Sequence, residues 1–222
     1  MILQDSFKRA RVEIELGIRS SLSRASNQVR SATWPFFGYR QPPPARAKRA
    51  VLARYGSHAD TWVETGTYFG HTSRWLASIA REVVTIEPEV RLANRATRRL
   101  SHIGNVKVVQ GYSELILPQV MPSLSGSVSF WLDGHYSGGV TALGEVVTPI
   151  IRELAQIESY LNRLLAVSVF VDDFRLFPPN ETEDTDYPPR SKLVNWAVKN
   201  QLSWTVEHDI FVASTLRLEH FE

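Results

Sequence analysis

Short apolar stretches alternate with amphipathic segments over most of the chain. Stretches rich in β-branched and aromatic residues predict strands at residues 60–64, 83–87, 106–110, 127–133, 165–172, 204–208 and 210–216. Helical spacing of apolar residues predicts helices at 71–81, 89–102, 144–161 and 191–201. Strands that alternate with helices form a parallel sheet covered on both faces. We therefore expect an α/β fold that ends in a hairpin.

The first 45 residues have a different pattern. Apolar residues recur every three or four positions between residues 3 and 29, which predicts one long amphipathic helix with a basic opposite face. Three consecutive prolines at 42–44 predict a stiff linker, because proline cannot continue a helix. We therefore divide the chain into a helix and linker at 1–45 and a folded domain at 46–222. The helix has three interpretations: packing on the domain, homodimerisation, or peripheral contact with a membrane surface.

Composition narrows the class of protein. The 222 residues include no cysteine, which excludes a disulfide framework, a zinc–thiolate site and a cysteine nucleophile. No apolar run approaches the length of a membrane span and no secretory signal is visible, so we expect a soluble cytoplasmic protein. Residues 1–55 carry 11 Lys+Arg against 3 Asp+Glu, and residues 56–222 carry 14 against 20. The acidic body argues against nucleic acid as the substrate and favours a small-molecule partner.

Ligands of parallel α/β sheets bind beyond the carboxyl ends of the strands. At the first of these ends, Glu64 is followed by a turn with Gly66 and Gly70. This turn lacks one glycine of the pattern that cradles a pyrophosphate, so it suits a nucleoside without pyrophosphate. Glu64 would repel a phosphate and could accept a hydrogen bond from an ammonium group. The alternative is a turn that serves packing alone.

An acidic residue also ends the second predicted strand. Glu87 lies 21 residues after Gly66, close to the spacing at which a carboxylate holds a ribose diol in nucleotide-binding folds. A carboxylate can accept hydrogen bonds from both ribose hydroxyls at once. We therefore predict that Glu87 binds a ribose.

These segments, together with Gln110-Gly111-Tyr112-Ser113, resemble class I S-adenosylmethionine-dependent methyltransferases over about residues 58–217. The resemblance implies a Rossmann-like, doubly wound and mostly parallel sheet of seven strands with an antiparallel last strand. It implies that the turn at Gly66 approaches the methionine part of the methyl donor, that Glu87 holds the ribose, and that the segment at Tyr112 lines the adenine. The predicted donor-binding residues are Glu64, Thr65, Gly66, Thr67, Tyr68, Gly70, Glu87, Tyr112, Ser113 and Asp133.

Three aspartates follow two further strands: Asp133 ends one, and Asp172 and Asp173 end the other. Unpaired carboxylates that are buried close together are very unfavourable, and Mg²⁺ with its preference for oxygen ligands would compensate them. The trio resembles the metal site of magnesium-dependent O-methyltransferases. In the alternative interpretation, Asp133 contacts the ammonium end of the donor or caps a loop, and one of the other two pairs with Arg175.

His135 follows Asp133 in a glycine-rich loop and is the predicted general base, because an unperturbed imidazole titrates near neutral pH. We name His135 and Asp133 as candidate catalytic residues. The acidic, proline-rich segment 174–190 is either a lid over the site or a solvated loop. The chain is thus expected to methylate a hydroxyl of a small polar or sugar-like acceptor, assisted by Mg²⁺. The alternatives are an NAD(P)-dependent oxidoreductase on a related fold and a non-catalytic binding protein that retains the fold.

Overall fold

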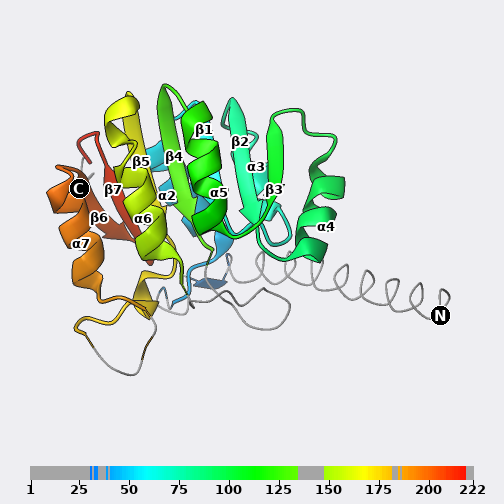
Figure 1. Ribbon diagram of the computed structural model, residues 1–222. Helices are drawn as coiled ribbons and strands as arrows, with labels where there is room; N and C mark the ends of the chain where they lie inside the picture. The colour runs from blue at the N-terminus through cyan, green and yellow to red at the C-terminus, as the bar shows by residue number, and fades with distance from the viewer. Residues whose placement is uncertain are drawn as a thin grey trace. The chain divides into compact units, whose positions relative to one another are not determined.

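A seven-stranded sheet forms the centre of the protein, whose computed structural model describes residues 31, 33–34, 39, 41–134, 148–181, 185 and 187–218 (Figure 1). Its strands are β1 (Thr61–Thr65), β2 (Glu82–Glu87), β3 (Val106–Gln110), β4 (Ser127–Leu132), β5 (Ala166–Val171), β6 (Ser203–Glu207) and β7 (Ile210–Ser214). They lie in the order β3-β2-β1-β4-β5-β7-β6. The first five run parallel, and β7 is antiparallel to both of its neighbours. The expected fold class is therefore confirmed.

Helices cover both faces of this sheet. They are α2 (Ala45–Gly56), α3 (His71–Leu76), α4 (Val90–Leu100), α5 (Ser113–Val120), α6 (Ile150–Glu158) and α7 (Arg190–Lys199). Short 3-10 turns lie at Met121–Ser123, Leu161–Arg163 and Phe174–Leu176. Helices α5, α6 and α7 pack together on one face (Figure 1). Residues of α2 and α3 pack on the other.

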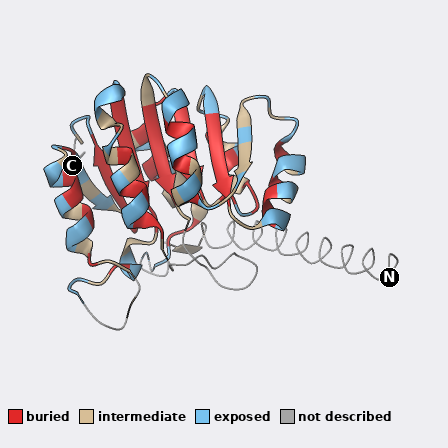
Figure 2. Cartoon of the chain, in the orientation of Figure 1, coloured by how far each residue is buried: buried red, intermediate tan, exposed pale blue. Residues whose placement is uncertain are grey.

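The alternation of side chains along each strand builds the two cores. In β4, Phe130 and Leu132 join the core under α5, α6 and α7, whereas Trp131 between them joins the core under α2 and α3. Successive side chains of a strand point to opposite faces, so a strand covered on both sides must be apolar at nearly every position. The central strands are accordingly buried along their length, whereas the edge strands β3 and β6 are partly exposed (Figure 2).

Two of the expected helices are much shorter than predicted. The helix expected at 71–81 ends at Leu76, and the side-chain amide of Asn105 donates to the carbonyl oxygens of Ala77 and Ala80 just beyond it, both at 3.0 Å. These bonds satisfy carbonyl groups that a longer helix would otherwise satisfy. The helix expected to begin at residue 144 begins at Ile150, directly after Pro149, which has no backbone N–H and is suited to a helix start.

Helix α5 was not expected, and Pro118 lies inside it. Proline cannot donate to the carbonyl four residues earlier, which here belongs to Glu114. The side-chain amide of Gln156 on α6 donates to that carbonyl oxygen at 2.6 Å. A tertiary contact thus replaces the missing hydrogen bond and allows the helix to continue past the proline.

The chain divides into two compact units, Met1–Ala50 and Val51–Glu222. In the first, the rings of Trp34 and Tyr39 meet edge to face, with their centroids 5.0 Å apart. The amphipathic helix expected at residues 3–29 and the candidate base His135 lie outside the described residues, so both stay predictions, as does the domain division at residue 45. None of the helices in the described part of the chain has the length and apolar character needed to cross a bilayer.

Candidate functional site

The carboxyl ends of four parallel strands lie along one edge of the sheet. Thr65 at the end of β1 pairs with Ile86 of β2 and with Leu132 of β4. Leu132 in turn pairs with Val171, the last residue of β5. This register brings the residues that follow each strand, which include the predicted site residues, to the same edge.

The turn after β1 is held against both neighbouring strands. Gly66 has a φ of 88°, and its backbone N–H donates to the carbonyl oxygen of Ile86 at 2.9 Å. The N–H of Thr67 donates to the same oxygen at 3.2 Å. A Cβ atom on Gly66 would lie 2.4 Å from the carbonyl oxygen of Asp133 after β4. Only glycine therefore allows the turn and the end of β4 to approach this closely.

Glu64 lies beneath this turn in a buried network of hydroxyl groups. Its Oε2 accepts hydrogen bonds from Ser73 on α3 and from Thr85 on β2, the latter at 2.7 Å. The hydroxyl groups of Thr85 and Thr67 are also hydrogen-bonded, at 2.6 Å. Glu64 is only 1% exposed, and burial raises the pKa of its carboxyl group to about 7, although the two hydroxyl donors act in the opposite direction. Glu64 therefore links β1, β2 and α3 and titrates near neutral pH.

Glu87 joins the glycine turn to the end of β2. Its Oε2 accepts from the backbone N–H of Tyr68 at 2.7 Å, and its Oε1 accepts from the N–H of Glu89 at 3.0 Å. Burial raises the pKa of the Glu87 carboxyl group, whereas these two backbone bonds act to lower it. The bonds orient both oxygens, and each oxygen keeps a lone pair for a further donor.

Other residues predicted to bind the donor lie at the end of β1 and in the turns that lead into α3 and α5. Tyr68, whose φ is 48°, and Tyr112, which precedes α5, are each 38% exposed and present aromatic surface. Ser113 is buried at the first position of α5, and Gly70, whose φ is 68°, precedes α3. Thr65 is fully buried, and its hydroxyl group has no hydrogen-bond partner among the described residues.

The three aspartates predicted to bind Mg²⁺ lie at the ends of β4 and β5. Asp172 is buried, and its Oδ1 accepts from the backbone N–H of Asp173 at 2.8 Å. Asp173 forms an ion pair with Arg175 at 2.7 Å, as the alternative interpretation of the sequence expected. Within the described ranges, no group of three or more His, Asp or Glu side chains is arranged to hold a metal ion. The trio therefore does not fit a Mg²⁺ site in this arrangement, and an arginine stands beside one of the expected ligands.

Tyr187 also lies near this edge of the sheet, although the sequence did not identify it as a site residue. Burial, together with the negative charges of Asp173 and Asp133, raises the pKa of its phenol group to about 12, and the charge of Arg175 acts in the opposite direction. Its ring packs edge to face on Phe177, with the centroids 5.2 Å apart. The segment after β5 thus brings a protonated phenol group into the electrostatic field of both strand ends. In the sequence it is one of three aromatic residues in the acidic, proline-rich segment 174–190.

Comparisons with known proteins identify similar folds. No family model and no curated protein matches the sequence. Solved methyltransferase structures are similar to the chain at low sequence identity. The O-methyltransferase TomG from Streptomyces achromogenes, in complex with SAM, is 21% identical, and the alignment covers 86% of this chain and 89% of TomG at a TM-score of 0.48.

Two further structures have the same general similarity. DhpI, in complex with SAH, is 17% identical over 87% of this chain and 92% of its own, at a TM-score of 0.44. The 23S rRNA methyltransferase ErmE is 16% identical over 76% of this chain and 65% of its own, at a TM-score of 0.45. The order and directions of the seven strands establish the fold independently of these similarities: it is a Rossmann-like methyltransferase fold.

Proposed function

We propose that this protein transfers the methyl group of S-adenosylmethionine to a hydroxyl group of a small polar or sugar-like acceptor. The observation that carries the proposal is the arrangement of Glu87 beside the glycine turn. Its buried carboxylate is oriented by the N–H of Tyr68 within that turn, at the carboxyl edge of a seven-stranded sheet. Ligands of such sheets bind at this edge.

The residues at this edge of the sheet suit the binding of S-adenosylmethionine. The remaining lone pairs of Glu87 would accept from the ribose hydroxyls, and the turn from Gly66 to Gly70 would approach the methionine part. Tyr112 and Ser113 would lie beside the adenine, and Asp133 would accept from the ammonium end of the donor. Carboxylates attract the positive charges of a sulfonium and an ammonium group and repel the pyrophosphate of a nicotinamide cofactor. This electrostatic preference favours a methyl donor over NAD(P).

The reaction follows from these roles. When bound, the donor supplies a methyl carbon that carries a good leaving group, the sulfonium sulfur. His135 would accept the proton of the acceptor hydroxyl as the new C–O bond forms and the C–S bond breaks, so that the electron pair of the broken bond stays on sulfur. Asp133 precedes His135 in the sequence and would keep a negative charge beside the reacting groups. In-line positioning of the two reactants would supply much of the rate.

Binding measurements test the donor assignment. We expect calorimetry to detect binding of S-adenosylhomocysteine to the wild-type protein and no binding of NAD⁺. Glu87→Gln should weaken this binding about 10- to 100-fold, the range expected when hydrogen bonds to a charged group are lost. Glu82→Gln changes an exposed glutamate at the other end of β2 and is the matched control, which should bind as the wild type does. Thermal melting should accompany each titration, because Glu87 also accepts two backbone hydrogen bonds.

Each outcome separates the candidate functions. Binding of NAD⁺ instead of S-adenosylhomocysteine would favour the oxidoreductase, and binding of neither would reject the donor site. Donor binding without turnover on any acceptor would favour the non-catalytic protein. For the acceptor, the donor can carry a carbon-13 methyl group, and the chemical shift of the product methyl distinguishes transfer to oxygen from transfer to nitrogen. A panel of sugars, phenols and RNA would show whether the acceptor is a small molecule.

A further inference from the structure

The end of β5 concentrates negative charge in a confined region. Asp172 is buried, and Asp173 follows it with a φ of 52°. Asp209 in the turn between β6 and β7 lies close by, because Val171 at the end of β5 pairs with Phe211 near the start of β7. The Asp209 side chain is only 3% exposed. Buried carboxylates require a compensating positive charge or hydrogen-bond donors.

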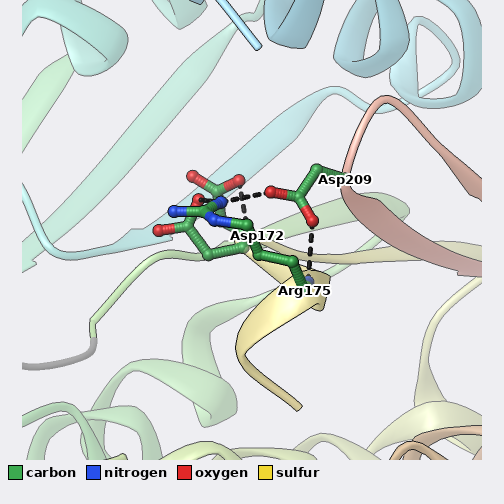
Figure 3. Close-up of polar contacts among 4 residues, drawn as sticks. Asp172, Arg175 and Asp209 are labelled. Atoms are coloured by element: carbon green, nitrogen blue, oxygen red, sulfur yellow. Dashed lines mark hydrogen bonds and ion pairs between the residues drawn. The ribbon is translucent and has the colours of Figure 1, made fainter. Parts of the chain in front are cut away.

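Arg175 provides that positive charge and is held by three contacts. Its Nη1 donates to Oδ1 of Asp173 at 2.7 Å and also to Oδ2 of Asp209. Its backbone N–H donates to Oδ1 of Asp209 at 2.7 Å. Figure 3 shows the guanidinium group among these carboxylates, with the short turn that contains Arg175 directly beside it. The arginine is thereby fixed from both its main chain and its side chain.

The backbone around this ion pair is anchored as well. The N–H of Phe174 donates to the carbonyl oxygen of Asp209 at 2.9 Å, and the N–H of Asp173 donates to Asp172. Asp209 thus receives hydrogen bonds on its carboxylate and on its backbone carbonyl from consecutive residues after β5. Hydrogen bonds between charged groups are stronger than those between neutral groups, so this arrangement resists displacement.

The same guanidinium group acts on the rest of the strand-end region. Burial and the charges of Asp173 and Asp133 raise the pKa of Tyr187, and the charge of Arg175 opposes this increase. Arg175, Tyr187 and the aspartates after β4 and β5 therefore share one electrostatic environment. A divalent metal at this place would need the carboxylate lone pairs that now accept from Arg175, because cations and N–H donors compete for the same oxygen atoms.

We propose that Arg175, held in place by Asp209, is the resident cation of the carboxylates after β5 and takes the position that a divalent metal would otherwise occupy. In this arrangement Arg175 is a positioning residue: it fixes Asp173 and, through the backbone of Asp173, the buried carboxylate of Asp172. The proposal concerns the charge balance of this edge and does not depend on the identity of the methyl donor.

Magnesium titration of the full-length protein tests this proposal. We expect the wild type to show no heat of Mg²⁺ binding and the same melting temperature in MgCl₂ and in EDTA. Arg175→Met should melt at a lower temperature and should bind Mg²⁺ detectably, with an affinity about tenfold or more above the detection limit set by the wild-type titration, the range that charged hydrogen bonds supply. Arg175→Lys should restore part of the stability without the response to metal, because lysine keeps the charge.

Arg190→Met is the matched control. The Arg190 guanidinium lies 5.0 Å over the ring of Phe174, and its Nε donates to the carbonyl oxygen of Phe177 at 2.8 Å. This variant removes an arginine from the same segment without removing the partner of Asp173, so it should show no response to Mg²⁺. An equal response in both variants would overturn the proposal.

A second measurement covers the case in which Arg175→Met does not fold. Wild-type protein that binds Mg²⁺, and loses that binding in Asp173→Asn, would show that the metal displaces Arg175 and would overturn the proposal. Wild-type protein without Mg²⁺ binding, together with an Asp209→Asn variant that is less stable at every Mg²⁺ concentration, would support it. A folded Arg175→Met protein without any response to Mg²⁺ would also count against the proposal.

Discussion

Replacement of Glu64 by glutamine should change how the stability of the protein depends on pH. Glu64 is buried, and its Oε2 accepts from the hydroxyl groups of Ser73 and Thr85. Glutamine keeps a carbonyl oxygen for those donors but cannot ionise. The variant therefore isolates the contribution of the carboxyl proton.

The sign follows from the direction of the pKa shift. Burial raises the pKa of Glu64 from 4.5 to about 7, so the native state holds the proton more tightly than the unfolded state. The stabilisation is complete below the unfolded pKa and is lost as the pH rises through the native pKa. At about 1.4 kcal/mol for each unit of pKa, the wild type should lose roughly 3 kcal/mol across this range, a loss that the glutamine variant avoids.

Urea unfolding at about pH 5 and about pH 8, followed by tryptophan fluorescence and circular dichroism, measures this effect. From the lower to the higher pH, the difference in unfolding free energy between Glu64→Gln and the wild type should shift by roughly 2–3 kcal/mol in favour of the variant. Any effect of the substitution on stability that does not depend on pH cancels from this comparison. Glu82→Gln, on an exposed part of the same sheet, should show no such gain. A difference between Glu64→Gln and the wild type that stays the same at both pH values would refute the assignment of a raised pKa to Glu64.

Two further predictions concern the backbone of the fold. Gly66→Ala should lower the unfolding free energy by about 2 kcal/mol or more, because φ is 88° and a Cβ atom would lie 2.4 Å from a backbone oxygen. Thermal melts measure this effect, and Gly104→Ala, where a Cβ atom has open space, is the control. Equal effects of the two substitutions would contradict this explanation. Gln156→Met should cost about 1–3 kcal/mol in urea unfolding, because it leaves the carbonyl oxygen of Glu114 without its donor. Adding Pro118→Ala should recover part of that loss by restoring a backbone N–H, and a purely additive double variant would contradict the coupling.

The strands were predictable because of their position in the sheet. A parallel strand that is buried on both faces must be apolar at nearly every position, and such a run is visible without a structure. The observed β3 has the expected bounds, and β1, β4 and β5 differ from expectation by only one residue at either end. The residues after these strands were then placed by topology, since parallel strands end at one edge.

Contacts between distant residues were not predictable. Arg175 and Asp209 are 34 residues apart, and their pairing depends on the register between β5 and β7. Glu64 and Thr85 are 21 residues apart and meet only because β1 and β2 are neighbours. The sequence around these residues does not indicate their partners, because side-chain contacts across a sheet depend on strand order and register.

The amino-acid pattern alone was sufficient to predict the class of fold, the strand positions and the acidic residues at the strand ends. Burial and periodicity determine which residue types occur at each position, so these features can be identified from the sequence. The packed structure was needed to establish which carboxylates lie in the core and which cation faces them. It also explained how a helix continues past Pro118, where the side chain of Gln156 replaces a missing backbone donor. These features depend on side-chain contacts across the sheet and between helices, and the local sequence does not indicate which distant residues form such contacts.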